Sequence, residues 1–211
     1  MTKVLILGAN GAVSKAAINS FLENTSYTLR LFLRDANRLP DYASDRIRVR
    51  EGDATNFEDV NRAMEDVDIV LASLSGELDK EAQTIVDAMN VNNVKRLIFV
   101  TSIGIYNEVP GNFGLWVQDQ ISDYLVIYRK AADIIEQSDL DYTIFRPAWL
   151  THTNEIDYEI TKKDEPFKGT EVSRKSVAAI AVQIAKDPAL YSRDNIGINK
   201  PNTDFDKPRW K

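Results

Sequence analysis

The 211-residue sequence contains no cysteine and a single histidine, His152. Without cysteine the chain forms neither a disulfide framework nor a thiolate nucleophile, and one histidine does not complete the usual zinc ligand sets. A Ser-His-Asp triad would have to use His152, but the sequence has no Gly-x-Ser-x-Gly nucleophile turn to go with it. We therefore predict no metal site, and we expect His152 to be an exposed loop residue.

The sequence also lacks a basic block and a long hydrophobic run. Its formal net charge is −6, so the electrostatic attraction behind most binding to nucleic acids or anionic membranes is missing. No apolar stretch approaches the roughly 20 residues that span a bilayer, and the N-terminal one is too short for a signal peptide. We expect a cytoplasmic monomer or homodimer that binds a small-molecule substrate, and neither nucleic acid nor a membrane.

The chain does have a regular alternation of β-branched runs and amphipathic stretches. With 44% hydrophobic residues it is large enough for one domain with a sizeable core. The runs recur at intervals of about 20 to 30 residues, as in βαβ units that build a doubly wound parallel sheet of the α/β class. We predict strands at residues 4–7, 29–33, 47–50, 69–72, 97–101 and 141–147, and a weaker one at 196–198.

Helical spacing of apolar residues predicts helices at 57–67, 80–92, 116–137 and from Ser173 to near Pro188. The longest should pack across the sheet through one buried stripe, made of Val117, Ile121, Tyr124, Leu125, Tyr128, Ala132 and Ile135. Residues 151–169 are polar and charged and are broken by Pro166. They are the best candidate for a lid or substrate loop, within a small C-terminal region at about 148–211.

The most informative segment is GANGAVS, residues 8–14, which lies between the apolar run 4–7 and the helix-like run 15–22. A strand, a glycine turn and a helix start in that order form a site for a pyrophosphate. Gly8 lets the chain turn sharply, and Gly11 lets the backbone approach the ligand around Asn10. The N–H groups of the first helical turn, at Ala12 and Val13, then point at the anion. Ordinary strand-to-helix turns match this glycine spacing by chance, so the prediction depends on the residues downstream.

The carboxyl ends of the predicted strands carry the next candidates, because ligands of doubly wound sheets bind there. Arg34 follows the second strand, and Arg38 lies four residues further on. A guanidinium at this place pairs with the 2′-phosphate of NADP, whereas a carboxylate takes the ribose hydroxyls of NAD. The alternative is a solvated surface pair of Arg34 with Asp35. We favour NADP(H) as the cofactor.

Small and polar residues follow the other strands. Asp53, with Ala54 behind it, is placed to accept a hydrogen bond from the adenine amino group, unless it is only a turn aspartate. Thr101 and Ser102 put two hydroxyls beside the predicted nicotinamide. The fourth strand ends in small residues that leave room for a ribose: Ala72, Ser73 and Leu74.

Two later segments make a family resemblance specific: YRKAAD at 128–133 and DYTIFRPAWL at 141–150. In this order the motifs resemble the atypical short-chain dehydrogenase/reductase proteins, and among them the NmrA-like NAD(P)-binding group with its biliverdin-IXβ/flavin-reductase-like enzymes. The resemblance covers nearly the whole chain. It implies a single Rossmann-type domain over residues 1–211, with NADP(H) across the strand ends, Pro147, Ala148 and Trp149 beside it, and Lys130 on the ribose.

The sequence departs from this family at three positions. The third glycine of Gly-x-x-Gly-x-x-Gly is Ser14, which is still small. The tyrosine of the catalytic Tyr-x-x-x-Lys, which would use Lys130, is Val126, and valine donates no proton. A histidine after the proline motif is replaced by Trp149, whose indole walls the nicotinamide, stacks on a planar substrate, or packs at the rim.

Tyr124 and Tyr128 flank the missing tyrosine, but two helical positions correspond to roughly 200° around the axis, so we expect both in the core. Ser102 is then the best hydroxyl to bind a substrate carbonyl, and Tyr106 is a weaker candidate acid. These residues predict an NADP(H)-dependent oxidoreductase that transfers hydride to a small quinone-, flavin- or carbonyl-type acceptor. The alternative is a non-catalytic NADP(H)-binding redox sensor of the NmrA type, whereas a sugar-nucleotide epimerase is disfavoured by the short C-terminal portion.

Overall fold

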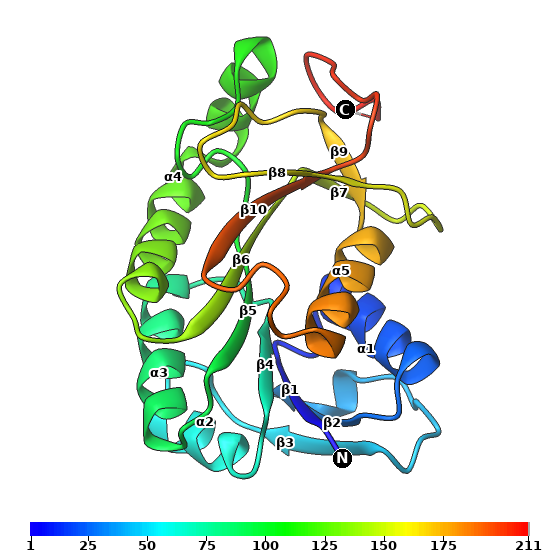
Figure 1. Cartoon of the computed structure of the whole chain (residues 1–211), viewed down its shortest axis with the longest axis vertical. Coiled ribbons are helices and arrows are strands. Elements are labelled where there is room, and N and C mark those ends of the chain that lie inside the picture. The colour runs from blue at the N-terminus through cyan, green and yellow to red at the C-terminus, as the bar shows by residue number, and fades with distance from the viewer. Residues whose placement is uncertain (211) are drawn as a thin grey trace.

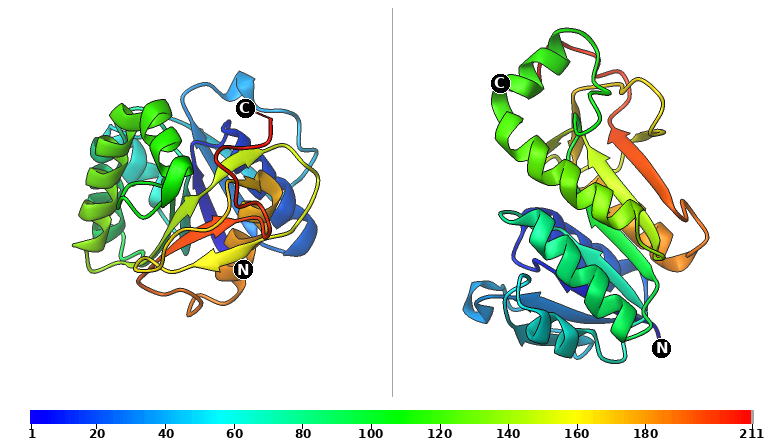
Figure 2. Two further views of the ribbon diagram at one scale, coloured as in Figure 1. Left: turned by 90° about the horizontal axis from the view of Figure 1, so that it is seen from above. Right: turned by 90° about the vertical axis from the view of Figure 1, so that its left-hand side faces the viewer.

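Apolar strands form the middle of a mostly parallel eight-stranded sheet with helices on both faces (Figures 1 and 2). The computed structural model describes residues 1–210. The strands of this sheet, in spatial order, are β3 (Ile47–Glu51), β2 (Thr28–Leu33), β1 (Lys3–Leu7), β4 (Ile69–Ala72), β5 (Arg96–Val100), β6 (Asp141–Pro147), β10 (Asp194–Asn199) and β8 (Glu159–Thr161). The helices are α1 (Ala12–Asn24), η1 (Ala36–Arg38), α2 (Phe57–Met64), α3 (Leu78–Val91), α4 (Gly111–Glu136) and α5 (Arg174–Lys186).

The order of the strands follows from which of them are apolar on both faces. Residues 4–7 of β1 and 69–72 of β4 are buried almost completely, as expected for parallel strands covered by helices on both sides. The outermost strand β3 carries Arg48, Arg50 and Glu51 and is largely exposed; such charges protect a free edge from pairing with other chains. The α/β fold and the predicted strands are thereby confirmed, and the chain reverses direction of winding between β1 and β4.

The helices divide between the two faces of the sheet. α1 packs against α5 on one face, to the right in Figure 1, whereas α2, α3 and α4 pack together on the other. Within residues 1–210, no helix is long and apolar enough to cross a membrane. Both layers place their helix N-termini near the carboxyl ends of the parallel strands, which is where ligands of such sheets bind.

Helix α4 is longer than the predicted helix and is not continuous. It begins at Gly111, and Ile121 interrupts it with non-helical backbone angles of φ −139° and ψ 21°. The half after Ile121 packs beside α3, and the half before it extends beyond the sheet (Figure 1). In that first half Trp116 meets Trp149 edge to face, with 4.6 Å between ring centroids.

The predicted lid segment 151–169 is only partly a loop. β8 lies within it and pairs antiparallel with β10 at the edge of the large sheet. The short strands β7 (Trp149–Thr151) and β9 (Glu171–Ser173) flank it and pair in parallel as a second sheet. His152 follows β7 and is exposed, as predicted. The role of this segment as a lid stays a prediction.

A buried ion pair ties the end of β6 to the loop after β5. The Arg146 side chain is fully buried, and its Nη1 donates to Glu108 Oε1 at 2.5 Å while its Nε donates to Asn195 Oδ1 at 2.7 Å. The Glu108 carboxylate also accepts the backbone N–H groups of Gly104 and Tyr106. This pair fixes the loop that carries the hydroxyls after β5.

Replacing Glu108 by alanine should leave the Arg146 guanidinium buried without its anion. We expect the free energy of unfolding to fall by about 3–5 kcal/mol, the usual cost of breaking a buried pair from one side. Chemical denaturation measures it. As a control, Asp133→Ala breaks the exposed pair Arg129–Asp133 on α4 and should cost under about 1 kcal/mol. Equal effects of the two variants would contradict the structural importance of the buried pair.

Candidate functional site

The glycine turn holds three strands together at their carboxyl ends. Gly8 adopts a left-handed φ of +78°, and a Cβ built on it would lie 2.3 Å from the Ser73 carbonyl oxygen. The N–H groups of Gly8 and Ala9 both donate to Phe32 O at 3.1 Å, and Ser73 N donates to Leu7 O at 3.1 Å. No side chain fits between β1 and β4 here, so only glycine meets both requirements at position 8.

Gly11 is needed for a different reason. It is the N-cap of α1 with an ordinary φ of −63°, is exposed, and would bring a Cβ no closer than 3.2 Å to Gly8 O. No side chain caps this helix, and its first turn holds no acidic residue, so its free N–H groups are available to an anion. Ser14 on the inner side of the same turn is fully buried, and its small side chain lets α1 approach the sheet.

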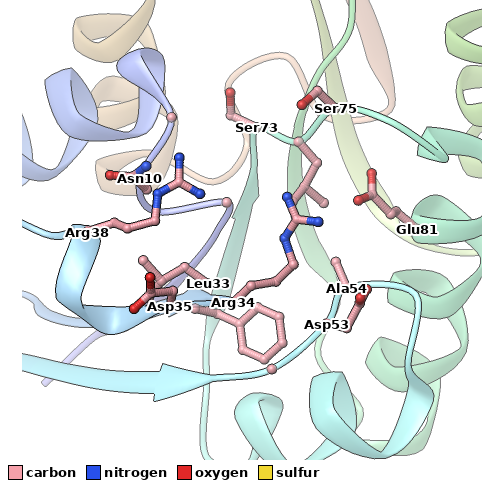
Figure 3. A pocket seen from close by; sticks show the side chains of 15 residues that line it. Asn10, Leu33, Arg34, Asp35, Arg38, Asp53, Ala54, Ser73, Ser75 and Glu81 are labelled. Carbon is pink, nitrogen blue, oxygen red and sulfur yellow. The ribbon is translucent and has the colours of Figure 1, made fainter.

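A cavity of about 300 Å³ extends from this turn across the ends of β2 and β3 (Figure 3). We call it the glycine-turn pocket. Asn10 lies at its rim, and the Asn10 Oδ1 atom is buried without a hydrogen-bond partner among residues 1–210. The pocket is lined by Gly8, Asn10, Gly11, Phe32, Leu33, Arg34, Asp35, Arg38, Gly52, Asp53, Ala54, Ser73, Leu74, Ser75 and Glu81.

Three predicted cofactor residues lie at this pocket without lining it. Ala72 is fully buried in β4 and Val13 is buried under α1, so their side chains belong to the core. Ala12 is exposed at the start of α1. Only the backbone of Ala12 and Val13 is available to a ligand.

Arg34 and Arg38 supply positive charge to the glycine-turn pocket. Across the described residues neither guanidinium has a carboxylate within 4.0 Å, whereas the Asp35 carboxylate accepts the N–H of Asn37 at 3.1 Å and caps η1. The alternative of an Arg34–Asp35 surface pair is therefore wrong. Figure 3 shows both guanidinium groups directed into the pocket, where an anion would pair with them.

Asp53 is a turn aspartate, as one of its two interpretations predicts, and its contact with adenine stays a prediction. Its Oδ1 accepts the Thr55 N–H at 2.9 Å and the Thr55 hydroxyl at 2.8 Å, so it does stabilise its own turn. These hydrogen bonds, helped by the nearby Arg34 charge, hold the pKa of the Asp53 carboxyl below its ordinary value. Asp53 also lines the pocket. As an ionised carboxylate it can only accept hydrogen bonds there.

Glu81 is a pocket residue that the sequence interpretation missed. It lies in the first turn of α3, is 8% exposed, and its Oε2 has no hydrogen-bond partner among residues 1–210. Burial, and next the charge of Asp53, raise the pKa of the Glu81 carboxyl to about 7. The signal was present: Glu81 stands between Leu78 and Ile85 on the face that α3 buries, where an acid is out of place in a purely structural helix.

A second cavity, of about 370 Å³, lies at the ends of β5 and β6. We call it the aromatic pocket. It contains the predicted residues Thr101, Ser102, Pro147, Ala148 and Trp149, and β5 is the sheet neighbour of β4, whose end borders the glycine-turn pocket. Sequence interpretation did not place the rest of its lining there: Ile103, Ile121, Tyr124, Tyr128, Leu150 and Arg174.

The prediction that Tyr124 is a core residue is wrong, whereas Tyr128 packs against the core and is partly buried. Tyr124 is 57% exposed, Tyr128 is half-buried, and both line the aromatic pocket next to Ile121. The backbone of α4 is non-helical at Ile121, which itself lines this pocket, whereas the other members of the predicted stripe are buried as expected: Val117, Leu125, Ala132 and Ile135. Burial, and next the Glu81 carboxylate, raise the pKa of the Tyr128 phenol, so it keeps its proton and serves as a hydrogen-bond donor.

The structure does not bring Lys130 or Tyr106 to either pocket. Lys130 is exposed, like Val126, because each is two positions from Tyr128 and therefore on the far side of the helix. The Tyr106 phenol donates to Glu136 Oε1 at 2.9 Å and accepts from Asn195 Nδ2 at 2.8 Å. Burial, followed by that bond to Glu136, raises the pKa of Tyr106 well above its usual value. Its contacts are structural, and we leave both residues out of the site.

A parallel sheet in the order 3-2-1-4-5-6, a glycine turn before a helix N-terminus and a pocket with two free guanidinium groups define a nucleotide-binding protein of the Rossmann class. The comparison with known families agrees. The chain belongs to the NAD(P)H-binding family, whose model matches residues 8–188.

Individual relatives support this assignment. A structure from Shigella flexneri, described as a Rossmann-fold NAD(P)-binding family protein, is 42% identical, covers 99% of this chain and 98% of its own, and has a TM-score of 0.86. A short-chain dehydrogenase/reductase from Veillonella parvula DSM 2008, solved in complex with NADP, is 28% identical with a TM-score of 0.94 over 99% of each chain. The uncharacterized sugar epimerase YhfK of Bacillus subtilis (strain 168) is 26% identical over 191 residues, 83% of this chain and 79% of that protein.

Substitutions at the two glycines of the turn should affect different properties of the protein, ligand binding at Gly11 and stability at Gly8. Gly11→Val should abolish NADPH binding, measured by fluorescence titration, because the branched side chain takes the space of the ligand. It should lower the melting temperature only slightly, because its Cβ would lie 3.2 Å from Gly8 O. Gly8→Ala should lower the stability of the protein itself, by about 1–2 kcal/mol from the left-handed backbone alone. If Gly11→Val keeps its affinity for NADPH, the cofactor does not lie on this turn.

Proposed function

We propose that this protein is an NADP(H)-dependent oxidoreductase that transfers hydride to a small quinone-, flavin- or carbonyl-type acceptor. The observation that carries the proposal is the aromatic pocket. It lies at the ends of β5 and β6, separated by β4 from the glycine turn after β1, and it offers flat side chains and hydroxyls together. When bound, the cofactor supplies the hydride, and the protein orients the two reactants.

The glycine-turn pocket fits NADP(H) through atoms that lack other partners. The N-terminus of α1 receives the pyrophosphate, and Arg34 and Arg38 receive the 2′-phosphate. The Veillonella parvula relative in complex with NADP supports this choice of cofactor. The nicotinamide half then extends toward β5, so its ring faces the aromatic pocket.

In that pocket the hydroxyls of Ser102 and Tyr128 are the proposed donors to the acceptor oxygen. Neither hydroxyl makes a hydrogen bond to any other residue of the described chain. Trp149 and Tyr124 provide flat surfaces for a planar acceptor. Because Tyr124 is more than half exposed, water reaches the pocket, and a reduced flavin or quinone, being weakly basic, takes its proton from water.

Two other functions are less well supported. A redox sensor would hold NADP(H) without turnover, and the absence of a tyrosine at Val126 favours it, but Tyr128 supplies a phenol from the opposite face of α4, which lines the pocket. The name of the Bacillus subtilis relative suggests a sugar epimerase. Ile121, Pro147 and Leu150 make much of this pocket apolar, whereas a sugar needs hydrogen-bonding groups for its hydroxyls.

The preference for NADPH over NADH tests the proposed identity of the cofactor. Arg34→Ala should weaken NADPH binding by a factor of roughly 10 to 100, because a charge-assisted contact contributes about 1.5–3 kcal/mol, and should leave NADH binding nearly unchanged. Calorimetry measures both affinities. The control is Arg50→Ala, which removes an exposed guanidinium of β3 outside the pocket and should change neither. Equal affinity of the wild type for NADPH and NADH would sink this assignment.

The rate of NADPH oxidation by an acceptor tests the proposed hydride transfer. Ser102→Ala and Tyr128→Phe should each lower kcat/KM for a quinone or carbonyl acceptor by about 10- to 100-fold, while the NADPH dissociation constant stays nearly unchanged, because the lost contact is to the acceptor. NADPH oxidation is followed at the nicotinamide absorbance band. Tyr106→Phe should leave kcat/KM unchanged. Tight NADPH binding with no oxidation across quinones, flavins and aldehydes would favour the sensor instead.

A further inference from the structure

The environment of the Glu81 carboxyl indicates that this group hydrogen-bonds a ligand. It is buried, its Oε2 has no hydrogen-bond partner in residues 1–210, and it lines the glycine-turn pocket. In Figure 3 its carboxyl points toward the space above Asp53 and Ala54. A buried carboxyl oxygen without a hydrogen bond lowers the stability of the folded protein. A ligand that donates a hydrogen bond to it, or accepts one from it, would restore that stability.

The charges around Glu81 come from four parts of the fold. The groups that face it are Arg34 at the end of β2, Asp53 after β3, Glu77 and Asp79 at the start of α3, and Tyr128 of α4. Burial and Asp53 oppose ionisation more than Arg34 favours it. The pKa of Asp53 is lowered and that of Tyr128 is raised, so neither changes its charge near pH 7.

The part of the cofactor that reaches Glu81 follows from the geometry of the pocket. One end of the cavity is the glycine turn, which receives the pyrophosphate, and the side near η1 holds Arg38. Beyond Arg34 the lining is Asp53, Ala54 and Glu81. The adenine is the group left for that end. Its Watson–Crick edge presents an amino donor beside a ring-nitrogen acceptor.

Asp53 satisfies only one half of that edge. As an ionised carboxylate it accepts from the amino group but has no proton for the ring nitrogen. A neutral carboxyl offers both: its C=O accepts and its O–H donates. We propose that Glu81, in its uncharged form, hydrogen-bonds the adenine of the bound cofactor, so that binding of NADP(H) takes up a proton at Glu81.

The proposal has a defined dependence on pH. The pKa of Glu81 is about 7 without cofactor, and hydrogen bonding by the neutral form together with the negative cofactor raises it further. Affinity is therefore highest below pH 7 and falls as the pH rises through that value. If binding raises the pKa by one unit, affinity falls by about sixfold between pH 6.5 and 8.5 and about half a proton is taken up at pH 7.5.

Calorimetry of NADPH binding at pH 7.5, in two buffers with different heats of ionisation, measures the proton uptake directly. NADH, which lacks the 2′-phosphate, serves as a second ligand, because that phosphate titrates near pH 6. Glu81→Gln keeps a carbonyl acceptor and an N–H donor but does not titrate. It should bind NADPH about as tightly as wild type at pH 6.5, show no proton uptake at Glu81, and lose the fall in affinity toward pH 8.5.

Two further variants make the test specific. Glu81→Leu should weaken NADPH binding several-fold at every pH, since both hydrogen bonds are lost. Glu77→Gln makes the same chemical change at an exposed acid of the same helical turn, outside the pocket, and should keep the proton uptake. Thermal unfolding at pH 6 and 8.5 checks folding: because burial raises the pKa of Glu81, the unliganded wild type loses stability as the pH rises through about 7, and Glu81→Gln does not.

Three results would overturn the proposal: no buffer-dependent heat in the wild type, weak binding by Glu81→Gln at all pH values, or normal binding by Glu81→Leu. The first two would mean that the cofactor does not favour the neutral acid, and the third that Glu81 does not touch it. The test needs cofactor binding alone, so a protein that never oxidises NADPH supports or contradicts it equally well.

Discussion

The close approach of the glycine turn to the end of β4 is the constraint on which the rest of the site depends. Gly8 lies so near the Ser73 carbonyl that a single Cβ would overlap it, and its N–H is held by Phe32 of β2. Three strand ends are thereby fixed relative to one another. This places the α1 N-terminus, Arg34 and the residues after β4 around one cavity.

Charge is arranged asymmetrically around that cavity. Arg34 and Arg38 have no anionic partner among the described residues and face the pocket, whereas Asp35 and Asp53 are engaged in their own turns. The two unpaired guanidinium groups favour an anionic ligand. The two carboxylates repel such a ligand less strongly, because each accepts hydrogen bonds within its own turn. Glu81 is the exception, because its carboxyl is buried without a partner. In the neutral form this acid adds no negative charge near the phosphates.

The sequence predicted the features that local rules determine. Strands appear as continuous apolar runs because both faces are covered, and the glycine turn is recognisable because Gly8 and Gly11 meet backbone requirements that other residues do not. The strand-end candidates Arg34, Asp53, Ser73 and Ser102 do line cavities, since parallel strands bring their carboxyl ends to one edge. The helical pattern does place Glu81 on the buried face of α3, but that it lines a pocket beside Asp53 and Arg34 depends on tertiary packing, which no local pattern records.

The error over α4 has a specific physical origin. A regular helix through Ile121 gives Val117, Tyr124 and Tyr128 one common face, and that face would belong to the core. The actual helix is interrupted at Ile121, and Trp116 in its first half packs against Trp149. Leu125, Ala132 and Ile135 of the same predicted stripe are buried as expected, so the error is confined to the part of the stripe that borders the aromatic pocket.

The same break changes the interpretation of the missing family tyrosine. Val126 and Lys130 occupy the exposed side of α4, so a tyrosine at position 126 would point away from the aromatic pocket. Tyr128 lies on the inner face instead, half-buried and close enough to Glu81 for that carboxylate to raise its pKa. Because burial, and next the Glu81 carboxylate, raise that pKa, the phenol keeps its proton and is able to donate a hydrogen bond. A phenol that stays protonated suits the proposed quinone-, flavin- or carbonyl-type acceptors, because the oxygen of each would accept its hydrogen bond.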